Sequence, residues 1–203
     1  MKKYAVLHEP GDIVTLAGTR FVVLDVERRG SLPDSLFLLA LESVGASEFG
    51  SSNNYAESDL KKAVDKWLED MGKRGLDNAK LIPREIDLTT LDGSGCYGKL
   101  SVKAAPLTLD EAREYADIIP NAERWCWLAT GWSGPSKSDG GLALYVSSNG
   151  DWHGLHCSNS YGIRPALKIP SDLLLDSADK PDLSEVPTDT LLEEIRRRVV
   201  DKA

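Results

Sequence analysis

The sequence lacks the features that mark several large protein classes. No apolar run approaches the roughly 20 residues of a membrane-spanning helix, so we expect no membrane span. The opening stretch MKKYAVLHEPGD has no long apolar core after its two lysines, and we expect no secretory signal. The 203 residues include three cysteines, Cys96, Cys126 and Cys157, an odd number without paired spacing. This usage is typical of reduced thiols in a cytoplasmic protein.

An excess of basic charge is also missing, because the formal net charge is −8. A binder of phosphate backbones normally shows a basic face, so we expect no nucleic-acid partner. No carboxylate pair, phosphate-binding loop or dinucleotide fingerprint is visible on which a reaction could be based. What is present is the composition of a globular chain of one or at most two domains, with 41% hydrophobic and 28% charged residues.

Regular elements are predicted along most of the chain. Apolar runs at 13–16, 20–26 and 35–41, separated by tight turns, predict an antiparallel meander. A helix is predicted after Ser58, where apolar residues recur at three- and four-residue steps as far as Met71 and where Gly72 closes the end. A second helix begins with a capping box of Thr108 and Glu111. Residues 73–106 have no clear periodicity and are expected to be irregular.

The domain organisation is predicted from composition. Residues 1–172 form one domain, and residues 173–187 form an acidic, proline-bearing linker. Residues 188–203 predict a short C-terminal helix with an apolar face. A helix this short is marginal alone, so we expect it to dock on the domain or to join copies into a homo-oligomer.

The dipeptide Asn149-Gly150 in LALYVSSNGDWHGLHC favours a two-residue hairpin turn, which pairs Val146 with His153. Strand alternation then predicts two faces. The expected core face holds Leu142, Leu144, Val146, His153, Leu155 and Cys157, and the expected half-exposed face holds Ala143, Tyr145, Ser147, Trp152, Gly154 and His156.

The histidines of this hairpin do not predict a metal site. His153 and His156 fall on opposite faces of the expected strand, whereas shared ligation needs a helix or a bent loop. A nucleophilic pair of Cys157 and His153 has no visible orienting carboxylate or oxyanion hole. We therefore expect no metal, no cofactor and no catalytic residue here.

The strand IRPALKI places an arginine directly before a proline. We expect Arg164 to be a buried tether, because a guanidinium can satisfy several acceptors at once. Trp152 is expected to be exposed beside the hairpin turn. Trp125 and Trp127 fit a surface position and a core position equally well.

Several motifs, in order, resemble an uncharacterised bacterial and phage family. They are GDIVTLAGTRFVVLDV, NNYAESDLKKAVDKWL, APLTLDEAREY, and finally WLATGW with ALYVSSNGDWHG and YGIRPALKI. The resemblance covers residues 11–170. The chain has Phe21 where the family usually has tryptophan.

The resemblance implies an α+β, C-type-lectin-like fold of short antiparallel strands with two helices, followed here by the C-terminal helix. That fold is shared with formylglycine-generating enzymes and with binding proteins diversified by retroelements, whose variable surface precedes a final G-[FIV]-R-P strand. Carried over, the invariant frame is Gly162, Arg164 and Pro165. The implied binding surface is Trp127, Trp132, Ser133, Ser136, Lys137, Asp139, Asn149, Asp151, Trp152, His153, His156, Ser158, Asn159 and Tyr161.

Two differences between this sequence and the related groups reduce the number of functions that the resemblance supports. The three cysteines do not match the spacing of the copper-binding pair in formylglycine-generating enzymes, which puts oxidase activity in doubt. The calcium triplets of sugar-binding lectins are missing too. The resulting hypothesis is a non-catalytic binder of a protein or glycan ligand, with a polar and aromatic surface and a cytoplasmic or virion-associated location. An oxidoreductase related to the formylglycine-generating group and a structural phage component are the alternatives.

Overall fold

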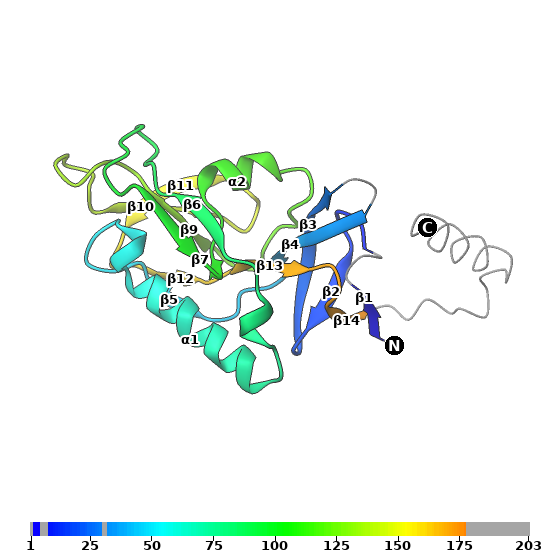
Figure 1. Cartoon of the computed structure of the whole chain (residues 1–203). Helices are drawn as coiled ribbons and strands as arrows, with labels where there is room; N and C mark the ends of the chain where they lie inside the picture. The colour runs from blue at the N-terminus through cyan, green and yellow to red at the C-terminus, as the bar shows by residue number, and fades with distance from the viewer. Residues whose placement is uncertain (1, 5–7, 30–31, 178–203) are drawn as a thin grey trace, which may run out of the picture.

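The computed structural model of the chain describes residues 2–4, 8–29 and 32–177 (Figure 1). The described chain is α+β, with mostly antiparallel sheets and two α-helices, as predicted. The helical elements are η2 (Tyr55–Glu57), α1 (Asp59–Lys73), η3 (Asn78–Lys80) and α2 (Leu109–Glu114). The strands are β1 (Lys2–Tyr4), β2 (Ile13–Leu16), β3 (Thr19–Arg29), β4 (Leu32–Ala40), β5 (Ala46–Glu48), β6 (Arg84–Asp87), β7 (Lys99–Val102), β8 (Ala104–Ala105), β9 (Cys126–Gly131), β10 (Leu142–Val146), β11 (Trp152–His156), β12 (Ser160–Gly162), β13 (Ala166–Pro170) and β14 (Leu174–Ser177).

Two large sheets organise these strands. A seven-stranded sheet has the order β1-β14-β2-β3-β4-β13-β8, and a five-stranded sheet has the order β11-β10-β9-β12-β5. Figure 1 shows the two sheets at opposite ends of the described chain, with β13 of the seven-stranded sheet on the side that faces the five-stranded sheet. The stretch YGIRPALKI, expected to form a turn and one strand, contributes residues to a strand of each sheet. β12 ends at Gly162 in one sheet, and β13 begins at Ala166 in the other.

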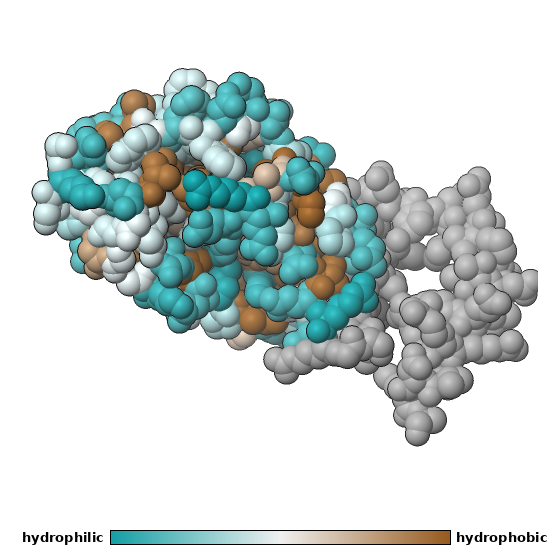
Figure 2. Space-filling view, turned by 90° about the horizontal axis from the view of Figure 1, so that it is seen from above, coloured by the Kyte–Doolittle hydropathy of each residue, from teal (hydrophilic) through white to brown (hydrophobic). Residues whose placement is uncertain are grey.

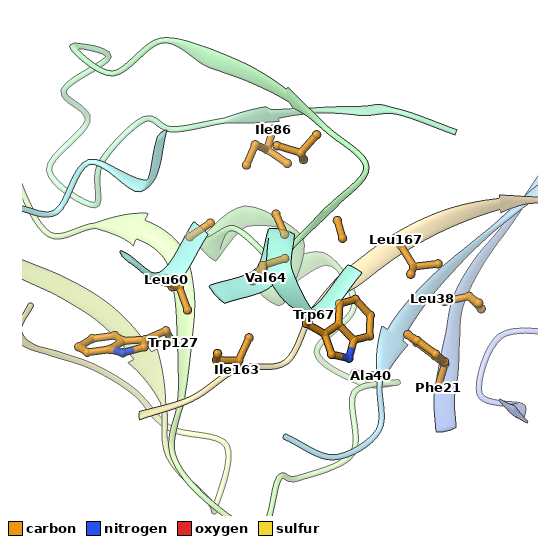
Figure 3. Close-up of a cluster of buried hydrophobic side chains, with 14 of the residues drawn as sticks. Phe21, Leu38, Ala40, Leu60, Val64, Trp67, Ile86, Trp127, Ile163 and Leu167 are labelled. Atoms are coloured by element: carbon orange, nitrogen blue, oxygen red, sulfur yellow. The ribbon is translucent and has the colours of Figure 1, made fainter. Parts of the chain in front are cut away.

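The core lies on both faces of the central strands. In β3, Phe21 and Val23 belong to a large cluster that includes α1, whereas Val22 and Leu24 belong to a second cluster with α2. Burial of both faces explains why this strand is a continuous apolar run and does not alternate with polar residues. Figure 3 shows the large cluster, in which Trp67 lies near Phe21.

Helix α1 follows the predicted pattern at its start. The Ser58 hydroxyl accepts a hydrogen bond from the Lys61 amide, and the buried stripe includes Val64 and Trp67. The predicted end at Gly72 is wrong, because the helix continues to Lys73. Gly75, at a φ of +102°, takes the left-handed position that closes a helix. The predicted capping box of Thr108 and Glu111 at α2 is confirmed.

Residues 73–106 are more regular than predicted. Arg84–Asp87 and Lys99–Val102 pair as β6 and β7 in a separate two-stranded sheet. At the other end of the domain, Leu174–Ser177 forms β14 against β1 and β2, so the seven-stranded sheet extends past residue 172 into the expected linker. The rest of that linker, 178–187, and the predicted helix 188–203 lie outside the described residues.

The exterior of the described chain is mainly polar on the face seen in Figure 2, where apolar side chains form small groups between hydrophilic ones. Within the described residues, neither α-helix has the length and apolar character needed to cross a membrane.

Candidate functional site

The hairpin of β10 and β11 has a three-residue loop, not the predicted two-residue turn. Ser147 pairs with Asp151, so Ser148, Asn149 and Gly150 form the loop, and Gly150 has a φ of +92°. A loop of this length with a glycine in the left-handed region is the next most common hairpin type. The Ser147 hydroxyl favours it by accepting a hydrogen bond from the Asp151 amide at 3.1 Å.

The extra loop residue reverses the predicted faces of β11. Val146 lies opposite Trp152, and Tyr145 lies opposite His153. A shift of one residue moves every side chain of a strand to the other face. His153 and Leu155 therefore share the face of Tyr145 and not that of Val146, whereas Trp152 and Gly154 lie on the side of α2.

The predicted tether at Arg164 is confirmed by its contacts. The side chain is buried, and Nε donates to the Ala40 carbonyl at 2.9 Å while Nη1 donates to the Pro120 carbonyl at 3.1 Å. Gly162 lies in a narrow gap, because a Cβ there would meet Cys126 Sγ at 2.8 Å. The stretch 162–165 thus joins the two sheets at a site where a side chain on residue 162 would not fit.

The structure separates the two tryptophans that the sequence could not distinguish. Trp127 is 1% exposed and packs edge-on against Phe49 in the core, so its predicted place on the binding surface is wrong. Trp125 is 44% exposed, among the highest values for a large apolar side chain in the described chain. Two residues apart on an extended chain, both side chains point to the same face. Trp125 precedes the first residue of β9, so the sheet does not cover it there.

Three rings form a stack that leads from the sheet to this tryptophan. Tyr145 lies between Trp125 and His153. Its ring centroid is 5.2 Å from that of Trp125, with an interplanar angle of 20°, and 5.5 Å from that of His153, with an angle of 29°. Tyr161 completes the cluster in a T-shaped contact with Trp125, with 5.6 Å between the ring centroids. Stacked and edge-to-face pairs at these distances are favourable beyond the area that they bury. The stack holds the exposed Trp125 ring in one orientation.

A polar groove of about 480 Å³ lies beside Trp125 and Tyr161. Its other lining residues are Ala46, Glu123, Arg124, Ser148, Ser160 and Gly162. The groove therefore combines aromatic surface with one carboxylate, one guanidinium, two serine hydroxyl groups and the phenol of Tyr161. Partial burial and the neighbouring Tyr145 raise the pKa of the Tyr161 phenol, which keeps its hydroxyl protonated and able to donate at neutral pH.

The remaining predicted surface residues do not converge on the groove. Trp132 is half-buried against Gly154, and Ser133 is 2% exposed, which corrects its predicted surface position. The others divide among separate places on the surface. Ser136, Lys137 and Asp139 lie on the 132–141 loop, Asn149 and Asp151 lie at the hairpin loop, and Trp152 lies beside α2. His156 is the last residue of β11, and Ser158 and the half-buried Asn159 lie in the turn that follows.

The two histidines of β11 have separate partners. His153 stacks on Tyr145, and His156 Nδ1 lies 2.9 Å from the Ser158 hydroxyl. Among the residues that the structure describes, no three side chains of histidine, cysteine, aspartate or glutamate are grouped to hold a metal ion.

The cysteines differ in burial. Burial raises the pKa of Cys126 to about 11 and that of Cys157 to about 12, so both remain thiols at neutral pH. Cys96 is exposed.

Comparison with known protein families, curated proteins and solved structures gives no match. The resemblance to a lectin-like family therefore stays a prediction.

Sequence reasoning placed His153 and Tyr161 in the candidate surface and left Trp125 between a surface and a core position, but it did not include Tyr145 or Arg124. A signal was available for Trp125, because the polar pair Glu123-Arg124 directly before it is typical of a solvated strand end. The correct hairpin register would also have placed Tyr145 opposite His153. Ser148 and Ser160 carried no signal, since only the fold brings their segments together.

Proposed function

We propose that the protein is a non-catalytic binding module that holds a saccharide ring against the exposed face of Trp125. The observation that carries this proposal is the fixed, 44% exposed indole at the end of the Trp125–Tyr145–His153 stack, beside a polar groove.

The aromatic part of the site supports a ligand with an apolar face. The π face of an indole is electronegative and attracts weakly positive C–H groups. Sugar rings present C–H groups on one face and hydroxyl groups around the edge. Because Tyr145 and Tyr161 already hold Trp125 in place, the ring loses little conformational freedom when a ligand binds.

The polar lining supports hydroxyl groups as the second recognition element. Glu123 accepts hydrogen bonds, Arg124 donates them, and the Ser148 and Ser160 hydroxyls do both. A protein partner would favour a more apolar site, since interface hot spots are well packed and fully desolvated. The acidic net charge of −8 agrees with a neutral ligand better than with a polyanion.

We propose the C-type-lectin-like scaffold and retroelement diversification as the finer description of this module. The ordered motifs of residues 11–170 support the scaffold. Sequencing the 3′ region of the gene in many copies from one population tests diversification. Substitutions concentrated at exposed positions such as Asn149, Trp152 and Ser158, with residues 162–165 unchanged, are expected. An even spread of substitutions would contradict it.

The saccharide proposal is tested with an array of immobilised oligosaccharides. The wild type is compared with Trp125→Ala and with Trp152→Ala, a matched control whose tryptophan is 41% exposed on the opposite face of the sheet. We expect Trp125→Ala to weaken binding about 30-fold, as for an aromatic hot spot of about 2 kcal/mol, and Trp152→Ala to leave it unchanged. Equal loss in both variants would place the site elsewhere. Binding of a protein, but of no saccharide, that depends on Trp125 would keep the site and reject the ligand class.

A further inference from the structure

A second pocket, distinct from the polar groove, lies on the other face of the five-stranded sheet. It has a volume of about 100 Å³ and lies between the segment that follows α2 and the hairpin of β10 and β11. Its walls are mostly apolar and include Leu39, Leu107, Leu128 and Val146.

The rim of this pocket carries the exposed tryptophan that the proposed saccharide site does not use. Trp152 lines the pocket and is 41% exposed. The Arg113 guanidinium of α2 lies 5.5 Å from the centre of its ring, within the range of a cation–π contact. Gly150 also lines the pocket, at a point where a Cβ would meet Asn121 Oδ1 at 3.0 Å. The hairpin of β10 and β11 and the segment that follows α2 therefore meet at the edge of the pocket.

The wall contains one buried cation whose charge has no acidic partner. Arg164 lines the pocket and is 7% exposed. Its Nε and Nη1 donate to the neutral carbonyls of Ala40 and Pro120, and its buried Nη2 has no hydrogen-bond partner. No carboxylate in the described part of the chain forms an ion pair with it. Two acidic groups act on Arg164 without an ion pair: first the Cys126 thiol, and then Glu42, which pairs with Arg20.

A buried charge without a counterion is costly, and an anion that reaches it recovers part of this cost. Burial lowers the pKa of the Arg164 guanidinium, as expected for a cation that is poorly compensated. The opposite charges of a guanidinium and a carboxylate strengthen the contact between them.

We propose that this pocket binds a small apolar carboxylate, with the hydrocarbon part against Leu107, Leu128 and Val146 and the carboxylate at Arg164. The size of the pocket sets the size of the ligand. A cavity of about 150 Å³ holds the six carbon atoms of benzene, so a pocket of about 100 Å³ suits a ligand of roughly four or five non-hydrogen atoms with the carboxylate included, such as propanoate.

The test compares propanoate with propanamide, which has nearly the same shape and no charge, by titration of the full chain followed by NMR. We expect the acid to bind about tenfold or more tightly than the amide and to shift the Trp152 indole N–H and the Ala112 methyl signals. Equal affinity of acid and amide, or no shift of these two signals with the acid, would overturn the proposal.

Variants locate the site. Ala116 lies at the exposed edge of the pocket, so Ala116→Trp is expected to abolish the shifts. Glu114→Trp, a control on the same segment outside the lining, is expected to retain them. Arg164→Gln, if it folds, is expected to lose the preference for the acid. If it does not fold, the comparison of acid and amide on the wild type decides. Shifts that persist in Ala116→Trp would contradict the assignment.

Discussion

Tyr145 and His153 lie directly opposite each other on β10 and β11, and their rings stack at 5.5 Å. This pairing exists because the hairpin loop has three residues, Ser148 to Gly150. With a two-residue loop, Trp152 would lie on the Tyr145 face and His153 would leave the stack. The length of the loop thus decides which aromatic side chain supports Trp125 and which one borders the pocket at Arg164.

Gly150 is expected to be essential for this loop. Its φ of +92° disfavours any L side chain, and a Cβ would also meet Asn121 Oδ1 at 3.0 Å. Gly11 has a nearly identical φ of +93° with nothing within 4 Å, so Gly11→Ala is expected to cost only the backbone strain of about 1–2 kcal/mol. Gly150→Ala is expected to lower the free energy of unfolding by more, as measured by urea denaturation. Equal losses would show that the contact with Asn121 has no energetic effect.

Gly154 is expected to accept no side chain while Trp132 is present. A Cβ at this position would lie 2.1 Å from Trp132 Cε3, so Gly154→Ala must displace the indole ring. We expect a loss of about 1–3 kcal/mol or more in stability. In the Trp132→Ala background, Gly154→Ala is expected to lower the free energy of unfolding by less than it does in the wild type. Gly95→Ala, with nothing within 4 Å, is the control that is expected to be neutral.

The cysteines are expected to react at very different rates. In the native protein at about pH 8, a thiol reagent is expected to modify exposed Cys96 rapidly, because the thiolate is the reactive form and must be accessible. Burial holds the pKa of Cys126 at about 11 and that of Cys157 at about 12, so their thiolate fractions remain small until the pH approaches these values. Mass spectrometry of labelled peptides, with Cys96→Ser as the control, checks this. Rapid native labelling of Cys126 or Cys157 would contradict the burial described here.

Asp92 is expected to make a small contribution to the acid dependence of stability, because water screens its exposed pair with Lys137. Hydrogen bonds from Lys137 and Thr90 lower the pKa of its carboxyl group from 3.8 to about 2. A depressed folded-state pKa contributes stability above pH 3.8, and this contribution is lost as the pH falls towards 2. Lys137→Met is therefore expected to flatten the fall in the free energy of unfolding between these two values. Ser136→Ala, in the same loop, is expected to leave the slope unchanged, and an unaltered slope in Lys137→Met would contradict the assignment.

Local signals predicted those parts of the fold that local chemistry determines. Ser58 marks the start of α1 because its hydroxyl satisfies an amide of the first turn, and the capping box at Thr108 works in the same way. The strands of the first meander could be predicted because both faces of β3 are buried, and burial of both faces leaves a continuous apolar run in the sequence. The tether at Arg164 was predicted because one guanidinium can serve carbonyls of two segments.

The candidate site could be predicted only in part. The dipeptide Asn149-Gly150 favours a two-residue turn in isolation, but the Ser147 hydroxyl stabilises a longer loop by its bond to Asp151. Trp125 and Trp127 follow the same alternation, and their depths differ only because β9 begins at Cys126. The groove joins segments near residues 46, 124, 148 and 161, and no spacing in the sequence indicates that they meet.

The most direct test of the proposed function is an NMR titration of the five tryptophan indole N–H signals with cellotriose, maltotriose and chitotriose. We predict that at least one of these saccharides shifts the Trp125 signal in a saturable way and leaves the Trp152 signal unchanged. A saturable shift at Trp152 alone, or no shift at Trp125 with any of the three, would contradict a saccharide site at the end of the aromatic stack.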